Sequence, residues 1–182
     1  MSTREEKMAK LAEINLAAQK AEEVKAKEIA EAQAAMAALD AELNAQFNAL
    51  VAEFNPNQVE YKATNAAWLK FMDETVEATL NSLQLVVEEH VSKTCDKLAN
   101  VVFNFTVNGT DINYSVLYAQ IKFDKELNKK VCKGYHMHQH MINQMFKASN
   151  TFFENAIIGK TFKVVYTVNE NNYHELKVVE LA

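Results

Sequence analysis

The fold is decided first by residues 11–50, which read LAEINLAAQKAEEVKAKEIAEAQAAMAALDAELNAQFNAL. This stretch contains no Gly or Pro. It is dominated by Ala, Glu, Lys, Gln and Leu, which lose little side-chain freedom in a helix. We therefore expect one helix from about Ser2 to Phe54, on the order of 75 Å long at 1.5 Å per residue.

Apolar residues recur along this helix at intervals of three and four, as in the seam of a coiled coil. The stripe consists of Leu11, Ile14, Ala18, Ala21, Ile29, Ala32, Met36, Leu39, Leu43, Phe47, Leu50 and Phe54. The rhythm breaks between Ala21 and Ile29, where Val24 and Lys25 compete for one position, and a stutter there would unwind a supercoil locally. A helix of this length has to bury its stripe against a second helix of the chain, another copy, or a different protein.

Beyond this helix, Asn55-Pro56-Asn57 is the clearest break, because Pro disfavours helix at the preceding residue and suits the first position of a new one. A second helical stripe follows, made of Trp68, Met72, Val76, Leu80, Leu83, Val87, Val91, Cys95 and Leu98. We expect a first domain at residues 1–55 and a second long helix at residues 56–100. The short break favours an antiparallel hairpin of the two helices.

After Asn100 the apolar period changes from 3.6 to 2. Alternating residues flank Asn108-Gly109, the strongest short-range signal for a β-hairpin. A second alternating pair flanks Asn169–Asn172. A helix from about Tyr135 to Ile158, ended by Gly159, separates the two hairpins. Residues 101–182 therefore predict a small β-β-α-β-β head.

The predicted fold class is α+β and predominantly helical: a long N-terminal helical hairpin or coiled coil followed by this head. Only three Gly and one Pro occur in 182 residues, which indicates few turns and long elements.

Composition argues against several classes of function. The formal net charge is −5, and the Lys and Arg residues form no dense cluster, so binding to a nucleic-acid backbone is not expected. Two cysteines are too few for a small secreted scaffold, and neither a signal peptide nor a membrane span is apparent. We expect a cytoplasmic protein, in the host cytoplasm or the virus particle if it is viral.

The strongest metal-like pattern is Cys132 with His136, His138 and His140, since imidazoles four residues apart on a helix can share a metal ion. The favoured interpretation is structural. Helical spacing makes Met137, Met141, Met145, Ala148 and Phe152 the buried stripe, and it places the imidazoles of His136 and His140 on the polar face. No metal or other cofactor is predicted. The Cys132 thiol is interpreted as unreactive, although Lys130 and Lys133 beside it could lower its pKa.

No enzyme signature occurs. The three glycines stand apart, so no Gly-rich loop can hold a phosphate, and no Gly-x-Ser-x-Gly turn is present. Phe54, Tyr61 and Trp68 lie near the predicted turn. They form either a small local core or an interaction site, with core slightly favoured.

These observations predict a non-catalytic coiled-coil assembly or scaffolding protein that associates with itself and docks on another protein. The predicted interface comprises Ile29, Met36, Leu39, Leu43, Phe47, Leu50, Phe54, Tyr61 and Trp68. An extended arm with a compact head resembles, in design alone, the scaffolding and accessory proteins of virus particles, which implies a role in capsid or particle assembly. One alternative is a regulatory adaptor or inhibitor that binds one host protein through its helical arm. A second alternative is a metal-binding protein or enzyme that uses the three histidines.

Overall fold

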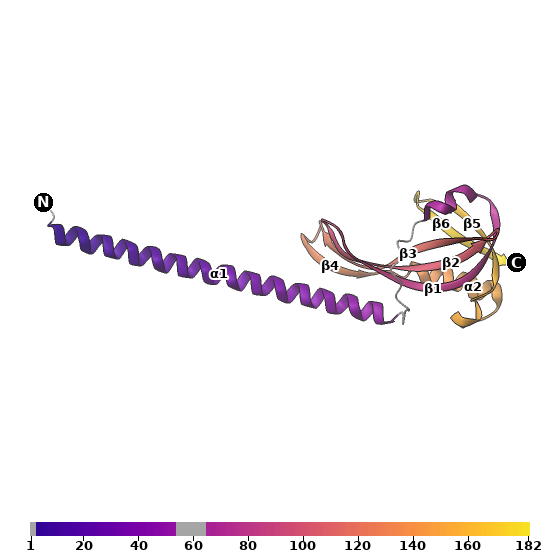
Figure 1. Cartoon of the computed structure of the whole chain (residues 1–182), viewed down its shortest axis with the longest axis horizontal. Helices are drawn as coiled ribbons and strands as arrows, with labels where there is room; N and C mark the ends of the chain where they lie inside the picture. The colour runs from indigo at the N-terminus through magenta and orange to yellow at the C-terminus, as the bar shows by residue number, and fades with distance from the viewer. Residues whose placement is uncertain (1–2, 54–64) are drawn as a thin grey trace. The chain divides into compact units, whose positions relative to one another are not determined.

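A computed structural model describes residues 3–53 and 65–182 of the chain (Figure 1). The chain divides into Met1–Leu43, here called the helix unit, and Asn44–Ala182, here called the sheet unit. The elements are α1 (Arg4–Glu53), η1 (Asn65–Phe71), β1 (Thr75–Ser92), β2 (Cys95–Val107), β3 (Thr110–Asp124), β4 (Lys129–Gly134), α2 (Met137–Ser149), η2 (Glu154–Ala156), β5 (Thr161–Val168) and β6 (His174–Leu181). Among the described residues, no helix combines the length and apolar character needed to cross a membrane.

The long N-terminal helix is confirmed as α1. Its start is a capping box, in which the Glu6 N–H donates to the Thr3 hydroxyl oxygen (3.4 Å) and the Thr3 N–H donates to the Glu6 carboxylate (3.0 Å). These two bonds satisfy N–H groups that have no partner within the helix. The first forty residues of α1 lie in the helix unit, and its last ten, residues 44–53, lie in the sheet unit.

Six strands form one antiparallel sheet in the order β4-β3-β2-β1-β5-β6. The predicted hairpin at Asn108-Gly109 is confirmed. It joins β2 to β3, and both turn residues have positive φ, as a type I′ turn requires. The predicted hairpin around Asn169–Asn172 is also present, between β5 and β6.

The prediction of a predominantly helical fold is wrong, and its error lies in the second long helix at residues 56–100. Asn65–Phe71 forms only a short 3-10 helix, and Thr75–Ser92 is the longest strand of the sheet. The predicted break at Asn55-Pro56-Asn57 falls outside the described residues.

A β-bulge explains why β1 looked helical. Its pairing with β2 shifts register between Leu80 and Ser82, so the side chains of Leu80 and Leu83 point to the same face of the sheet. A skip of three residues inside an alternating pattern produces intervals of three and four, which are also those of a helix. The β-branched residues of this stretch, Thr75, Val76, Thr79, Val86, Val87 and Val91, favour a strand.

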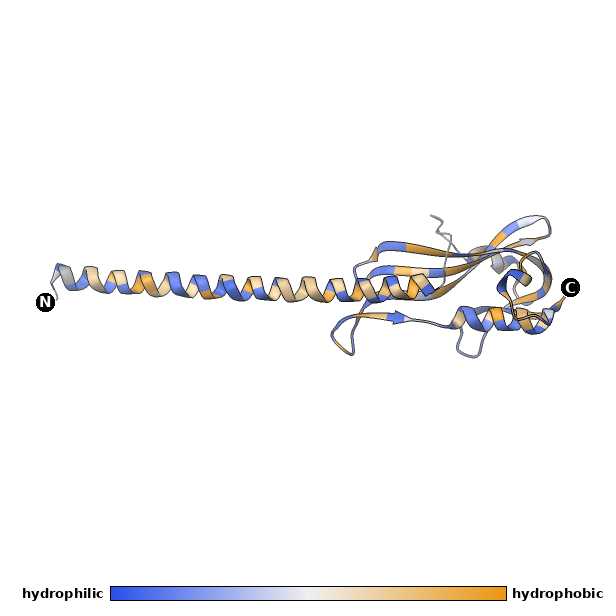
Figure 2. Cartoon of the chain, turned by 90° about the horizontal axis from the view of Figure 1, so that it is seen from below, coloured by the Kyte–Doolittle hydropathy of each residue, from blue (hydrophilic) through white to orange (hydrophobic). Residues whose placement is uncertain are grey.

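The sheet curls so strongly that strands far apart in its order meet. The Leu176 N–H of β6 donates to the hydroxyl oxygen of Tyr114 on β3 (3.2 Å), although three strands separate β3 from β6. Helix α2 packs against both strands. The Val178 N–H donates to the amide oxygen of Gln144, and the rings of His138 and Tyr118 lie 5.0 Å apart. Figure 2 shows the ribbon of α2 beside the curled sheet.

The largest fully buried side chains fill the inside of this curl. They include Trp68, Phe47, Phe103, Phe105, Phe162, Leu80, Leu85, Met145 and Ile157. Burial of such side chains is the main stabilising term of a small domain.

Helix α2 is shorter than predicted. It ends at Ser149, and Asn150 rather than Gly159 supplies the left-handed C-cap, with φ 49° and ψ 48°. Met141 and Met145 are buried, as their spacing predicted. The prediction is wrong for Met137 and for Phe152, because both are exposed.

Candidate functional site

The stripe predicted on α1 is exposed from Leu11 to Leu39. Every described side chain from Thr3 to Glu42 is exposed. Of the predicted interface residues, Ile29 is 57% exposed, Met36 68% and Leu39 40%; the large apolar side chains Met8, Leu11, Ile14, Leu16 and Val24 are more than half exposed as well. Single exposed apolar residues are ordinary, but so many on one helix form an extended apolar surface.

The other predicted interface residues do not share this exposure. Leu43 and Phe47 are buried, and Leu50 is half-buried. Trp68 is fully buried in the core of the sheet unit, so of its two interpretations the structure supports the core. Phe54 and Tyr61 fall outside the described residues.

The end of α1 is held against the sheet by contacts within the sheet unit. The Tyr118 hydroxyl donates to the Leu50 carbonyl oxygen (2.6 Å), one of the last four carbonyls of a helix, which have no partner within it. Gly134 on β4 allows the approach, because a Cβ there would lie 3.2 Å from the Leu50 side chain. The Phe47 ring packs below the Lys97 ammonium at 5.9 Å.

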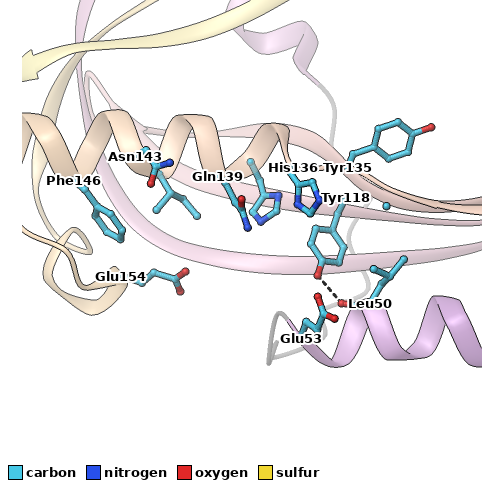
Figure 3. Close-up of a pocket in the computed structure, with 12 residues that line it drawn as sticks. Leu50, Glu53, Tyr118, Tyr135, His136, Gln139, Asn143, Phe146 and Glu154 are labelled. Carbon is cyan, nitrogen blue, oxygen red and sulfur yellow. Dashed lines mark hydrogen bonds between the residues drawn. The ribbon is translucent and has the colours of Figure 1, made fainter.

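A pocket of about 480 Å³ lies where this helix end meets α2 (Figure 3). It is lined by Leu50, Glu53, Tyr118, Gly134, Tyr135, His136, His138, Gln139, Ile142, Asn143, Phe146 and Glu154. The pocket is lined about equally by polar and apolar surface, and its polar groups are the carboxylates of Glu53 and Glu154, two imidazoles and two side-chain amides, beside the two tyrosines. It can hydrogen-bond a small polar or cationic group.

Burial controls the charge of the pocket's aromatic groups. Burial lowers the pKa of His138, and the neighbouring His136 lowers it further, so the His138 imidazole is neutral at pH 7. Burial, followed by the negative charge of Glu53, raises the pKa of the Tyr118 phenol. The phenol therefore keeps the proton that it donates to Leu50.

The three histidines of the metal hypothesis are not brought together. His138 points into the core against Tyr118, whereas His136 and His140 are exposed. The ring of His140 contacts the Gln144 amide at 3.2 Å. Within residues 3–53 and 65–182, no group of three or more His, Cys, Asp or Glu side chains has the arrangement of a metal site.

The Cys132 thiol is not activated by its neighbours. Burial raises its pKa. Lys130 forms an ion pair with Asp96 and Lys133 one with Asp124, each at 2.8 Å, so the nearby positive charges are offset by carboxylates.

An exposed aromatic pair was missed from the sequence. Phe152 is 82% exposed and Phe153 74%, in the segment that follows α2. Phe152 also lines a second, smaller hollow with Phe146 and Lys147. The signal was available, because Asn150 and Thr151 end the helical pattern and leave two adjacent aromatic residues in a connection.

Comparisons of this chain with protein-family models, with curated proteins and with solved structures found no match to it.

Proposed function

We propose that this protein is a non-catalytic assembly factor that associates with further copies of itself through the exposed stripe of α1. The observation that carries the proposal is the exposure of Ile29, Met36 and Leu39 on a fifty-residue helix whose described side chains are all exposed up to Glu42. Isolated helices depend on packing for most of their stability. A partner that covers the stripe supplies that packing.

The sheet unit supplies a second contact, to a different protein. Phe152 and Phe153 are the observation in its favour, because aromatic side chains are enriched at the centres of protein interfaces. One chain would then link copies of itself to another surface, as a scaffold does. The virus-particle interpretation stays a prediction that rests on design alone.

The runner-up function is a regulatory adaptor whose α1 binds a helix of one foreign protein. The same exposed stripe supports it. The two functions differ in the behaviour of the pure protein, because a scaffold associates alone and an adaptor does not.

Light scattering coupled to size-exclusion chromatography tests the proposal on the full chain. We expect the unmodified protein to associate and the double variant Ile29→Asp, Met36→Asp to be monomeric, because each charge would have to be buried unpaired in the seam. Ala34→Asp is the matched control. Position 34 lies two residues from both Ala32 and Met36, about 200° around the helix from each, on the opposite face.

A monomer at every concentration of the unmodified chain would rule out self-assembly and favour the adaptor. Association that survives the double variant would place the interface elsewhere. Leu43 is unsuitable for this test, because it is buried and a charge there would also disturb folding.

A further inference from the structure

The exposed part of α1 carries a heptad frame without interruption. Every seventh residue from Met8 gives Met8, Asn15, Glu22, Ile29 and Met36, and every seventh residue from Leu11 gives Leu11, Ala18, Lys25, Ala32 and Leu39. These two sets occupy the a and d positions of a coiled coil. The frame needs no stutter, but it places three polar residues, Asn15, Glu22 and Lys25, in the seam.

The direction of a second copy decides what these polar residues face. In a parallel pair each seam residue faces its own counterpart, so Glu22 meets Glu22 and Lys25 meets Lys25. In an antiparallel pair the second helix runs in the opposite direction, so the intervals of three and four between its a and d positions occur in reverse order along the seam. An a residue then lies level with a d residue of the other copy, and the two residue numbers have a constant sum.

When the two residue numbers in each layer add up to 47, Glu22 lies level with Lys25 of the second copy, and Lys25 lies level with Glu22 of the second copy. The remaining layers then pair Met8 with Leu39, Leu11 with Met36, Asn15 with Ala32, and Ala18 with Ile29. We propose that two copies of this chain pair antiparallel through α1, about a two-fold axis midway between Glu22 and Lys25. This inference rests on the self-association proposed above.

The sizes of the seam side chains favour the antiparallel pair, in agreement with their charges. It places the small Ala18 opposite the large Ile29, so the two helices keep an even separation. A parallel pair would set Ala18 against Ala18 and Ala32 against Ala32, with Ile29 against Ile29 between them. Layers of two Ala leave space that neighbouring large layers cannot fill, and such space is costly.

The length of the exposed segment agrees with the same axis. The described side chains from Thr3 to Glu42 are exposed, and the axis at 23.5 lies one residue from the middle of that stretch. Residue 5 of one copy comes level with residue 42 of the other. The second copy therefore covers the exposed stripe from end to end.

The polar layer acts on specificity more than on affinity. A paired Glu and Lys in a seam contribute little net stability, because both lose hydration, but like charges placed opposite each other strongly disfavour the dimer. A polar seam residue of this kind sets register and direction.

Charge reversals in the full chain test the direction. Glu22→Lys alone sets Lys against Lys in both central layers of an antiparallel pair, and we expect the dimer dissociation constant to rise at least about tenfold. The double variant Glu22→Lys, Lys25→Glu restores both pairs and should return the constant to that of the unmodified chain. A parallel dimer already holds Glu against Glu and Lys against Lys, so an unchanged constant in the single variant would overturn the proposal.

Cysteine cross-linking provides a second measurement. Met8→Cys and Leu39→Cys chains, one of them carrying a size tag, are mixed and oxidised. We expect the mixed 8–39 product and little 8–8 or 39–39 product; predominance of the last two would overturn the antiparallel arrangement while leaving self-association intact. The unmodified chain is the control for Cys95 and Cys132, whose pKa values are raised by burial. If no variant dimerises in light scattering, the self-association itself fails.

Discussion

Trp68 lies in η1 and not in a strand, yet its side chain is fully buried in the core of the sheet unit. Its indole N–H donates to the Asn113 carbonyl oxygen (2.8 Å), and its ring lies 5.7 Å from Phe105 and 6.2 Å from Tyr166. These rings belong to different strands, so one side chain links β2, β3 and β5.

Trp68→Ala should lower the free energy of unfolding of the sheet unit by about 3–5 kcal/mol, because it leaves a cavity among these rings. Trp68→Phe should cost less, since it keeps most of the apolar volume and loses only the N–H donor. Denaturant unfolding followed by circular dichroism measures both. Equal losses in the two variants would mean that the hydrogen bond, not the packing, is the main contribution.

Several positions with positive φ, which Gly often occupies in other proteins, are occupied by Asn in this chain. Asn108, Asn128, Asn150 and Asn172 all have φ between 49° and 61°. The short polar side chain of Asn tolerates this left-handed region better than most residues do. The elements are long, as the scarcity of Gly indicated, with 50 residues in α1 and 18 in β1. The scarcity of Gly was nevertheless a poor guide to the number of turns in the sheet unit, because Asn forms several of them.

At the scale of elements, η1 protects an open edge. Strand β4 pairs with β3 only from Ala119 onward, so within residues 3–53 and 65–182 no strand pairs with this edge of β3 near Ser115. The Asn65 side chain takes that place. Its amide nitrogen donates to the Ser115 carbonyl oxygen (3.1 Å), and its amide oxygen accepts from the Ser115 N–H (2.7 Å). An unpaired edge is a template for aggregation, so this cover has a physical purpose.

Asn65→Ala should destabilise the sheet unit by about 1–3 kcal/mol and speed hydrogen exchange at the Ser115 N–H, because both partners on β3 lose their bonds. Asn65→Asp is the matched control, since its carboxylate can still accept from that N–H. Exchange measured residue by residue should show protection in the Asp variant and its loss in the Ala variant. Protection unchanged in Asn65→Ala would show that η1 does not cover this edge.

At the scale of the whole molecule, the two units should unfold as separate events. The described side chains of the helix unit are exposed up to Glu42, so the proposed association would be the main source of stability for its helix. The sheet unit has its own core. Association stabilises a folded state in proportion to the logarithm of concentration.

Heating should therefore give a helix transition that shifts upward over roughly a hundredfold rise in protein concentration, and a sheet-unit transition that does not. Circular dichroism at 222 nm follows the first, and fluorescence of Trp68, the single tryptophan, follows the second. The Ile29→Asp, Met36→Asp variant should lose the concentration dependence. A helix transition independent of concentration in the unmodified chain would contradict the proposed assembly.

Local sequence patterns predicted the structure correctly where a pattern was compatible with a single type of element. The fifty-residue helix followed from propensity alone, because no Gly or Pro interrupts it. The hairpin at Asn108-Gly109 followed from a turn that needs positive φ at both residues. His136 and His140 were correctly placed on the polar face of α2, whereas His138, between them in the sequence, turned out to be buried against Tyr118.

The sequence by itself therefore determined α1, its apolar stripe and the central hairpin, because each depends on neighbours within a few residues. Only the tertiary structure decided that Thr75–Ser92 is a strand, since its bulged alternation matches a helix equally well and β2 and β5 supply the backbone partners. It also decided that the stripe divides near Leu43. Beyond that point Phe47 and Val51 bury their side chains, while Ile29, Met36 and Leu39 stay exposed. No local pattern reveals where along a helix such packing begins.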